Sequence, residues 1–417
     1  MNYSSAISTR DLRQGSRLAK PHFDVPLLLI TYAIAIFGLI AITAASYTPG
    51  QTSAVDTLFA RITQTRNGQK QGIFLLISPV VIAGVMSIDY RFIGNRLFAN
   101  LLFWAICGVL FMTYVVADTF QGVKGWLNVI YDYTVQPAEL AKIAIIIRLA
   151  QMLSHKEKPV SSAWDFMKMM MVIGIPAGLI LVAGEMGSAV VIIFFFMAMI
   201  VVAGVDMRVI AGIILGGLGA LIPLILMMRN SGSYRFNRLL GFIYPDLASA
   251  DITYQQRNSQ TAVGAGGWSG VGMFKDGSYT SLGYVPEGST DFIFASIGET
   301  MGFVGAAGLL ILYIFLIIRM LILAYNTHDR FGRLLITGVA AMLTYHIFQG
   351  VGMAIGLMPV MGIPLPFVSY GGSNLTTNMA GIALVLNVTL RKPQQTINTE
   401  GAISRRGKLP KPARKAA

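Results

Sequence analysis

Long apolar runs alternate with short polar segments along most of the chain. A bilayer core of roughly 30 Å is crossed by about 20 apolar residues in a helix. Measured against that length, the pattern predicts about ten membrane-spanning helices. They are expected near Val25–Tyr47, Ile73–Ile88, Leu97–Ala117, Gln136–Leu153, Phe166–Ala183, Ser188–Gly204, Arg208–Met228, Asp291–Tyr325, Leu334–Leu357 and Gly372–Val388. The eighth run is long enough to tilt or to begin outside the bilayer.

The composition agrees with an all-α polytopic membrane protein. Of the 417 residues, 54% are hydrophobic and 12% are charged, whereas about 25% of the residues in an average soluble protein are charged. A soluble globule with so few charges could not cover its apolar surface, so a cytosolic enzyme, a disordered chain and a fibrous repeat are excluded. The single cysteine, Cys107, lies in an apolar run, which excludes a disulfide framework and a cysteine metal site.

The basic residues predict how the chain is oriented. The net charge is +13, and most lysines and arginines between the spans fall on the side of both tails if the spans alternate. By the positive-inside rule this side is the cytoplasm, although Arg61, Arg66 and Lys70 fall on the other side. The positive charge is therefore expected to meet anionic lipids and not nucleic acid.

The predicted organisation has one large membrane domain between two tails. We expect a cytoplasmic basic tail over residues 1–24 and another over 391–417. Between them, residues 25–390 form a ten-helix domain with an extracytoplasmic loop over 229–290. The predicted location is the inner (cytoplasmic) membrane, with several passes and both termini in the cytoplasm.

The loop over residues 229–290 is the largest polar segment, and loops of this length in compact proteins are usually functional. Its cations include Arg235 and Arg238, and it contains a glycine-rich stretch, Ala262–Gly272. Backbone N–H groups of such a stretch can hold phosphates. The stretch fits neither the dinucleotide nor the Walker pattern, so a flexible loop is the more ordinary interpretation.

Asp291 follows this loop and precedes the eighth apolar run. One interpretation is helix capping, in which an aspartate satisfies the free N–H groups at a helix start. The alternative is a general base, because the carboxylate lies at the membrane boundary next to a cationic loop. The two interpretations are compatible, since a capping position also holds the carboxylate still.

A second external segment contains Lys124 and Trp126 and leads into the fourth span, where Glu139 and Lys142 are three residues apart. This spacing places the two charges on one helix face, so that they can pair. Charges within a span normally face the protein interior or a polar cavity. A structural ion pair and a role in the site are both open, and Trp126 is explained equally by the aromatic belt of the interface. We expect His346, within the ninth span, to be buried for packing or hydrogen bonding.

A third external segment, Met358–Asn374, is uncharged and rich in proline and contains Ser369 and Ser373. Its prolines forbid a regular helix. Non-helical backbone at membrane depth is tolerated only where it is buried in protein or lines a cavity. We therefore expect a re-entrant loop that forms a wall of an external pocket.

Three blocks in these segments resemble the signatures of the SEDS family, the RodA and FtsW peptidoglycan polymerases. They read KGWLNVIYDYTVQPAELAK, YVPEGSTDFIFASIGE and GLMPVMGIPLPFVSYGGSN, in the family's order and spacing. The last block is more similar to RodA, the elongation type, than to FtsW, the division type. The chain also departs from the family pattern. The family often reads Gln-Pro-Asp-Leu-Gly-Thr where this chain has Gly184-Glu185-Met186-Gly187-Ser188, Asn258 stands where a glutamine is expected, and Gln349 replaces a common asparagine.

The resemblance implies ten transmembrane helices and the polymerisation of lipid II into glycan strands for cell-wall synthesis. It also implies that the family's essential aspartate is Asp291. The implied partners are lipid II, the nascent glycan strand, membrane lipids and a class B penicillin-binding protein with transpeptidase activity. Candidates for binding substrate or its pyrophosphate are Lys124, Trp126, Arg235, Arg238, Glu139, Lys142, Ser369 and Ser373.

No metal-ligand set and no resident cofactor are indicated by the sequence, and a divalent cation is an alternative to the basic side chains for neutralising pyrophosphate. Two other functions stay open. Buried charges and broken helices also suit a lipid II flippase, and a non-catalytic scaffold for cell-wall enzymes is the third possibility.

Overall fold

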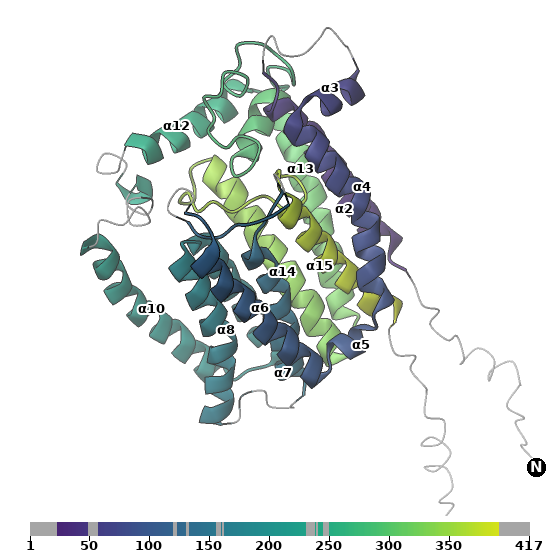
Figure 1. Ribbon diagram of the computed structural model, residues 1–417, viewed down its shortest axis with the longest axis vertical. Helices are drawn as coiled ribbons and strands as arrows, with labels where there is room; N and C mark the ends of the chain where they lie inside the picture. The colour runs from purple at the N-terminus through teal and green to yellow at the C-terminus, as the bar shows by residue number, and fades with distance from the viewer. Residues whose placement is uncertain are drawn as a thin grey trace, which may run out of the picture.

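The computed structural model describes residues 23–48, 57–119, 123–130, 133–155, 160, 162–230, 238, 241–244 and 250–391. Helices dominate this part of the chain (Figure 1). They are α2 (Val25–Ala45), α3 (Leu58–Gln64), α4 (Arg66–Ser87), α5 (Tyr90–Ile93), α6 (Arg96–Val116), α7 (Pro137–Ser154), α8 (Ala163–Ala183), α9 (Met186–Ala203), α10 (Met207–Asn230), α12 (Ala250–Ala265), α13 (Ile293–Tyr325), α14 (Arg330–Ala354) and α15 (Gly372–Leu390). One small antiparallel hairpin joins α6 to α7 and consists of β1 (Leu127–Ile130) and β2 (Tyr133–Val135).

Each predicted span coincides with a helix, which confirms an all-α polytopic membrane protein. Among the described residues, 7 helices are long and apolar enough to cross a membrane. The helix α7 falls outside that set although it packs within the bundle, since it carries Glu139, Lys142 and Arg148. The helix α15 also falls outside that set, and its buried polar residues include Asn374, Asn378 and Asn387.

The centre of the bundle is formed by α14 and α15, and the peripheral helices surround them. The helix α14 packs on α9, α13 and α7, and α15 packs on α4. Peripheral helices turn large apolar side chains outward, among them Leu29, Leu76, Trp104 and Phe315. Such side chains are suited to lipid, which is as apolar as they are. The helix α10 stands apart at the left of Figure 1 and touches α9.

Three arginines make contacts at the lower end of the bundle. We call the end at which α7, α9, α13 and α15 begin the upper end, as drawn in Figure 1. At the lower end, Asp24 caps α2 through the Leu27 N–H at 3.0 Å and binds the Arg319 guanidinium at 2.7 Å. Arg91 there donates to the Arg391 carbonyl at 3.0 Å. Arg91, Arg319 and Arg391 thus lie at the lower end, whereas Arg61 and Arg66, the exceptions to the alternation, lie at the upper end near Phe274 and Ser289.

The helix α4 begins earlier than the apolar run that predicted it. Its first turns contain the buried Gln71, which binds backbone groups of the segment before α15. The amide Nε2 lies 3.4 Å from the Ser369 carbonyl, and Oε1 accepts from the Gly371 N–H at 3.2 Å. A polar residue can occupy a buried position in a spanning helix when its hydrogen bonds are made within the protein.

The long helix α13 is broken and is not one tilted rod. Gly302 has φ 67° and ψ −166°, which interrupts the helix and leaves backbone groups unpaired. The glycine-rich stretch binds these groups: the Val271 N–H donates to the Glu299 carbonyl at 2.9 Å, and the Phe303 N–H donates to Gly267 at 2.9 Å. The interpretation of Ala262–Gly272 as a flexible loop is therefore wrong, because this stretch is fixed against α13.

Candidate active site

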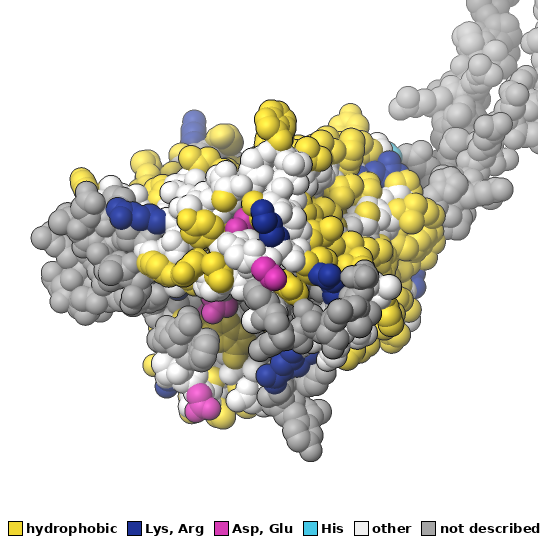
Figure 2. Space-filling view, turned by 90° about the horizontal axis from the view of Figure 1, so that it is seen from above, with side chains coloured by type: hydrophobic (Ala, Val, Ile, Leu, Met, Phe, Trp, Pro, Cys, Tyr) yellow, Lys and Arg dark blue, Asp and Glu magenta, His cyan; other side chains and the backbone are white. Residues whose placement is uncertain are grey.

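A cavity of about 280 Å³ opens at the upper end of the bundle. Figure 2, which looks at this end, shows hydrophobic side chains along the right flank and acidic and basic side chains on the end face itself. The walls are the starts of α7, α9 and α15, the turn before α13 and the proline-rich segment before α15. Polar side chains at the cavity are those of Thr134, Gln136, Glu185, Ser188, Arg238, Glu287, Thr290, Asp291, Ser373 and Asn374.

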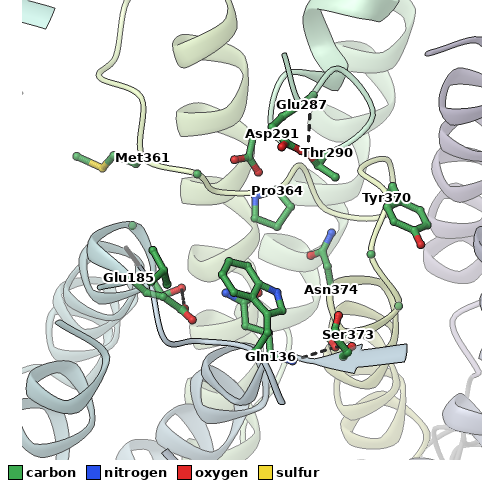
Figure 3. Close-up of a pocket in the computed structure, with 18 of the residues that line it drawn as sticks. Gln136, Glu185, Glu287, Thr290, Asp291, Met361, Pro364, Tyr370, Ser373 and Asn374 are labelled. Atoms are coloured by element: carbon green, nitrogen blue, oxygen red, sulfur yellow. Dashed lines mark hydrogen bonds between the residues drawn. The ribbon is translucent and has the colours of Figure 1, made fainter. Parts of the chain in front are cut away.

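Asp291 lies in the turn before α13, and its carboxylate points into the cavity (Figure 3). The turn is closed by the Phe292 N–H, which donates to the Glu287 carbonyl at 3.1 Å. The N-cap of α13 is Phe292, and no side chain caps the helix there. Asp291 therefore does not serve as the helix cap, and its role as a general base stays a prediction.

The proline-rich segment holds this turn in place. The Ser369 hydroxyl donates to the Thr290 carbonyl at 2.6 Å and accepts from the Leu365 N–H at 2.7 Å. Beside it, the Tyr370 N–H donates to the Ser289 carbonyl at 2.8 Å. The segment is non-helical and lines the cavity, which confirms the predicted pocket wall.

Gly362 brings the backbone of this segment close to the catalytic candidate. Its φ of 64° lies in the left-handed region, and a Cβ atom at this position would lie 3.3 Å from Oδ2 of Asp291. A side chain here would be strained and would crowd the carboxylate. Glycine thus permits a narrow cavity around Asp291.

The electrostatic surroundings adjust the proton affinity of Asp291. The pKa of this carboxyl group is raised to about 6, first by burial and then by the negative charge of Glu287, while the positive charge of Arg238 opposes the rise. The group remains mostly ionised at neutral pH but holds a proton more readily than an ordinary aspartate. These are the properties of a general base.

The other predicted site residues divide into two groups. Trp126, Arg238 and Ser373 line the cavity together with Asp291. Ser373 also joins β2 to α15, because it donates to Thr134 at 3.3 Å and accepts from the Gln136 N–H at 3.2 Å.

The remaining candidates lie elsewhere. Lys124 extends over the ring of Tyr114, with its ammonium group 5.5 Å from the ring centre. Ser369 is buried and acts on the Asp291 turn through the bond to Thr290. Arg235 lies outside the described residues. Their contacts with substrate remain predictions.

Glu139 and Lys142 form the predicted ion pair, at 2.6 Å, and both are buried in the bundle. The Lys142 ammonium also lies 3.0 Å from Nε2 of His346, which is fully buried as expected. A buried pair with a third polar partner is a fixed charge arrangement beneath the cavity. Neither charge is among the cavity-lining residues, so a direct role in substrate binding also remains a prediction.

Sequence reasoning missed Gln136, Glu287 and Asn374 as cavity residues and assigned no role to Glu185. A signal existed for Gln136, because a polar residue directly precedes a buried spanning helix that begins with proline. For Asn374 the signal was the same kind of polar position at the start of α15. Within the described ranges, no three acidic, histidine or cysteine side chains lie together as a metal site requires.

Comparisons with known proteins agree with one another. The model of the FtsW/RodA/SpoVE family, described as cell cycle protein, matches residues 25–394. The probable peptidoglycan glycosyltransferase FtsW of Trichlorobacter lovleyi is 30% identical over 91% of this chain and 95% of its own length. The peptidoglycan glycosyltransferase MrdB of Escherichia coli is 30% identical over 88% of this chain and 94% of its own.

Solved structures show the same likeness. A chain from a structure described as the structural coordination of polymerization and crosslinking by a peptidoglycan synthase complex has a TM-score of 0.70. It is 27% identical, with 88% of this chain and 97% of that chain covered. The rod shape determining protein RodA of Thermus thermophilus has a TM-score of 0.64 at 26% identity, with coverage of 89% and 98%.

Replacement of Ser369 by alanine tests the link between the proline-rich segment and the Asp291 turn. The change leaves the Thr290 carbonyl and the Leu365 N–H without their buried partner. We expect a loss of about 1–3 kcal/mol in the free energy of unfolding, measured by titration with a denaturing detergent. The control is Ser87→Ala, since the exposed Ser87 hydroxyl bonds only within its own helix to Gly84 at 2.7 Å. Equal stability of the two variants would contradict the link.

Proposed function

The chain belongs to the FtsW/RodA/SpoVE family of cell cycle proteins, and from this membership we propose that it polymerises lipid II into glycan strands at the outer face of the cytoplasmic membrane. It is a multi-pass membrane protein and a peptidoglycan glycosyltransferase, the activity that names its relatives. The observation that carries the proposal is the Asp291 carboxylate, which faces a cavity at one end of the spanning bundle, beside Arg238.

In the proposed reaction, Asp291 is the general base. It takes the proton from a hydroxyl group of the acceptor sugar as that oxygen attacks the anomeric carbon of the donor. A glycosidic C–O bond forms, the bond from the anomeric carbon to pyrophosphate breaks, and the polyprenyl pyrophosphate leaves with the electron pair. The configuration inverts from α to β. Arg238 is the described cation best placed to stabilise the negative charge of the leaving group.

The cavity end is proposed to face the outside of the cell. The support is that Arg91, Arg330 and Arg391 lie at the lower end, and the positive-inside rule assigns such an end to the cytoplasm. Arg61, Arg66 and Lys70 at the other end are the exceptions. The two predicted basic tails cannot be placed at this end, because residues 1–22 and 392–417 lie outside the described residues. This orientation places Asp291 where a lipid-linked sugar can reach it while the lipid stays in the bilayer.

We further propose the elongation type, with a class B penicillin-binding protein as partner. Relatives named FtsW and MrdB match at the same identity of 30%, so overall identity does not distinguish the two types. The support for the elongation type is the similarity of the block from Gly356 to Gly372 to RodA. The support for a partner is the likeness to a chain of a peptidoglycan synthase complex in which polymerization and crosslinking are coordinated. A lipid II flippase is the second candidate, favoured by the buried Glu139–Lys142 pair and the broken helix α13.

Purified protein supplied with labelled lipid II is expected to form glycan, and Asp291→Asn is expected to form none because an amide cannot accept the proton. The loss should be about 100-fold or more in rate, measured by gel separation of the labelled product. The matched control is Asp276→Asn, an exposed acid of the same end that binds the Tyr47 hydroxyl at 3.0 Å and does not line the cavity.

Full activity of Asp291→Asn would reject the base assignment. Movement of labelled lipid II across vesicles without any product would favour the flippase instead. A strain that grows normally with Asp291→Ala would favour a scaffold.

The rate should rise with pH as the Asp291 carboxyl group loses its proton near pH 6. The base form exists above its pKa, so activity is present at neutral pH and is lost as the pH falls. Glu287→Gln removes a negative neighbour, which lowers the pKa of Asp291 and should move the midpoint of the profile to lower pH. A midpoint that stays fixed or moves upward would mean that another group controls the profile.

Replacement of a cell's own polymerase by this chain tests whether it is of the elongation type or the division type. This chain should restore rod shape to cells depleted of their elongation polymerase and should not restore division to cells depleted of their division polymerase. Co-purification with the class B transpeptidase of the elongation system should accompany the rescue. Restoration of division alone would overturn the proposed type and leave the polymerase activity unaffected.

A further inference from the structure

Glu185 lies across the cavity from Asp291. It stands between the end of α8 and the start of α9, and both acidic side chains point toward the space between them (Figure 3). Although Glu185 occupies the N-cap position of α9, its side chain makes no capping hydrogen bond. The carboxyl group is therefore not used to complete the helix.

The neighbours of Glu185 hold its carboxyl group at the cavity wall. The Ser188 hydroxyl donates to Oε2 at 3.2 Å, and the side chain of Gln136 lies near enough to lower the pKa of the group. On its other side the backbone of Gly125 approaches so closely that a methyl group there would overlap Oε1. Gly125 is fixed through its neighbour Lys124, whose N–H donates to the Ala183 carbonyl at 2.8 Å. Glu185 is thus oriented from three sides, with the cavity on the fourth.

The pKa of Glu185 is raised to about 7, chiefly by burial and also by the negative charge of Glu139, while Gln136, Lys142 and Ser188 oppose the rise. At neutral pH the group is therefore present in both forms. Its protonated form donates a hydrogen bond and its ionised form accepts one. A carboxyl group that can both donate and accept a hydrogen bond suits an uncharged polar ligand with hydroxyl or amide groups.

The two walls of the cavity differ in the ligand they favour. Arg238 lies near Asp291, because both approach Gly362. A Cβ atom at Gly362 would lie 3.3 Å from Oδ2 of Asp291 and 3.7 Å from a guanidinium nitrogen of Arg238. Pyrophosphate is attracted to that cation, which is the one lysine or arginine among the described residues that line the cavity. The Glu185 wall is thus the one suited to the uncharged sugars of the substrate.

Resting on the proposed function, we infer that Glu185 and Gln136 form a sugar-binding subsite, which holds an N-acetylhexosamine ring of the lipid-linked substrate opposite Asp291. The carboxyl group of Glu185 binds a hydroxyl or amide group of the ring by hydrogen bonding, so a carboxamide can replace it. Gly125 acts through Glu185 as a positioning residue, because only glycine leaves space for the carboxyl group at this place.

The test measures the dissociation constant of fluorescent lipid II in the Asp291→Asn background, where no turnover occurs. Glu185→Ala should weaken binding by about tenfold or more, the usual effect of losing a hydrogen bond to a buried ionisable group. Glu185→Gln should restore most of the affinity. In the active enzyme, Glu185→Ala should raise KM more than it lowers kcat. Asp276→Asn is the control and should bind like the parent.

Gly125→Ala is a second variant that does not alter Glu185 itself. It should weaken binding by displacing the carboxyl group, and it should cause no further loss when combined with Glu185→Ala, because the two changes act through one interaction. The fold of each variant is checked by size-exclusion chromatography and detergent unfolding.

Unchanged binding in Glu185→Ala, equal losses in the Gln and Ala variants, or additive losses with Gly125→Ala would each overturn the subsite. These outcomes are separate from the failure of the proposed function, which would appear as a wild-type protein that forms no glycan. A polymerising wild type with normal binding in Glu185→Ala would reject the subsite alone.

Discussion

The position of Asp291 depends on hydrogen bonds between two non-helical segments inside a helical membrane protein. Lipid offers no partners for backbone N–H and C=O groups, so non-helical backbone must be satisfied by the protein itself. Ser369 does this for the Asp291 turn through its bonds to Thr290 and Leu365. Gln71 from α4 and Gln349 from α14 hold the same proline-rich segment, the latter by donating to the Pro359 carbonyl at 2.8 Å. The catalytic candidate is therefore fixed by the requirement that also keeps the bundle intact.

The same requirement explains the break in α13. Gly302 stops the helix, and the backbone groups it frees are bound by the glycine-rich turn that follows α12. The first part of α13 is thereby anchored to this turn from one side and to the proline-rich segment from the other. Asp291 directly precedes this short helical piece, which is held at both of these places. A carboxylate held in this way loses little freedom when substrate binds, which is the condition for efficient proton transfer.

The sequence was informative wherever one physical rule dominated. Among the described residues, apolar length located every helix that is long and apolar enough to cross a membrane, and helical spacing predicted the ion pair of Glu139 and Lys142. Prolines predicted a non-helical pocket wall, and the burial of His346 followed from its apolar run. The choice of Asp291 as a base needed the family resemblance, because local sequence favoured a helix cap that the structure does not contain.

What the sequence could not supply were contacts between distant segments. Gln71 lengthens α4 because its amide meets residues about three hundred positions later, as the bond to Gly371 shows. Glu185 acquires a cavity position only because Gln136 and Gly125 fold against it. Such contacts have no periodicity in the chain. They also decide which of several cations and acids face the cavity, as Arg238 does, while Lys124 lies over the ring of Tyr114.

The side of the membrane on which Asp291 lies is tested most directly by thiol labelling. The variant carries Met361→Cys, at the cavity beside Asp291, in a chain whose single native cysteine, the buried Cys107, is changed to alanine. A maleimide that cannot cross membranes should label it in intact spheroplasts as fully as after permeabilisation. Labelling that appears only after the membrane is opened would place the cavity in the cytoplasm and contradict the account.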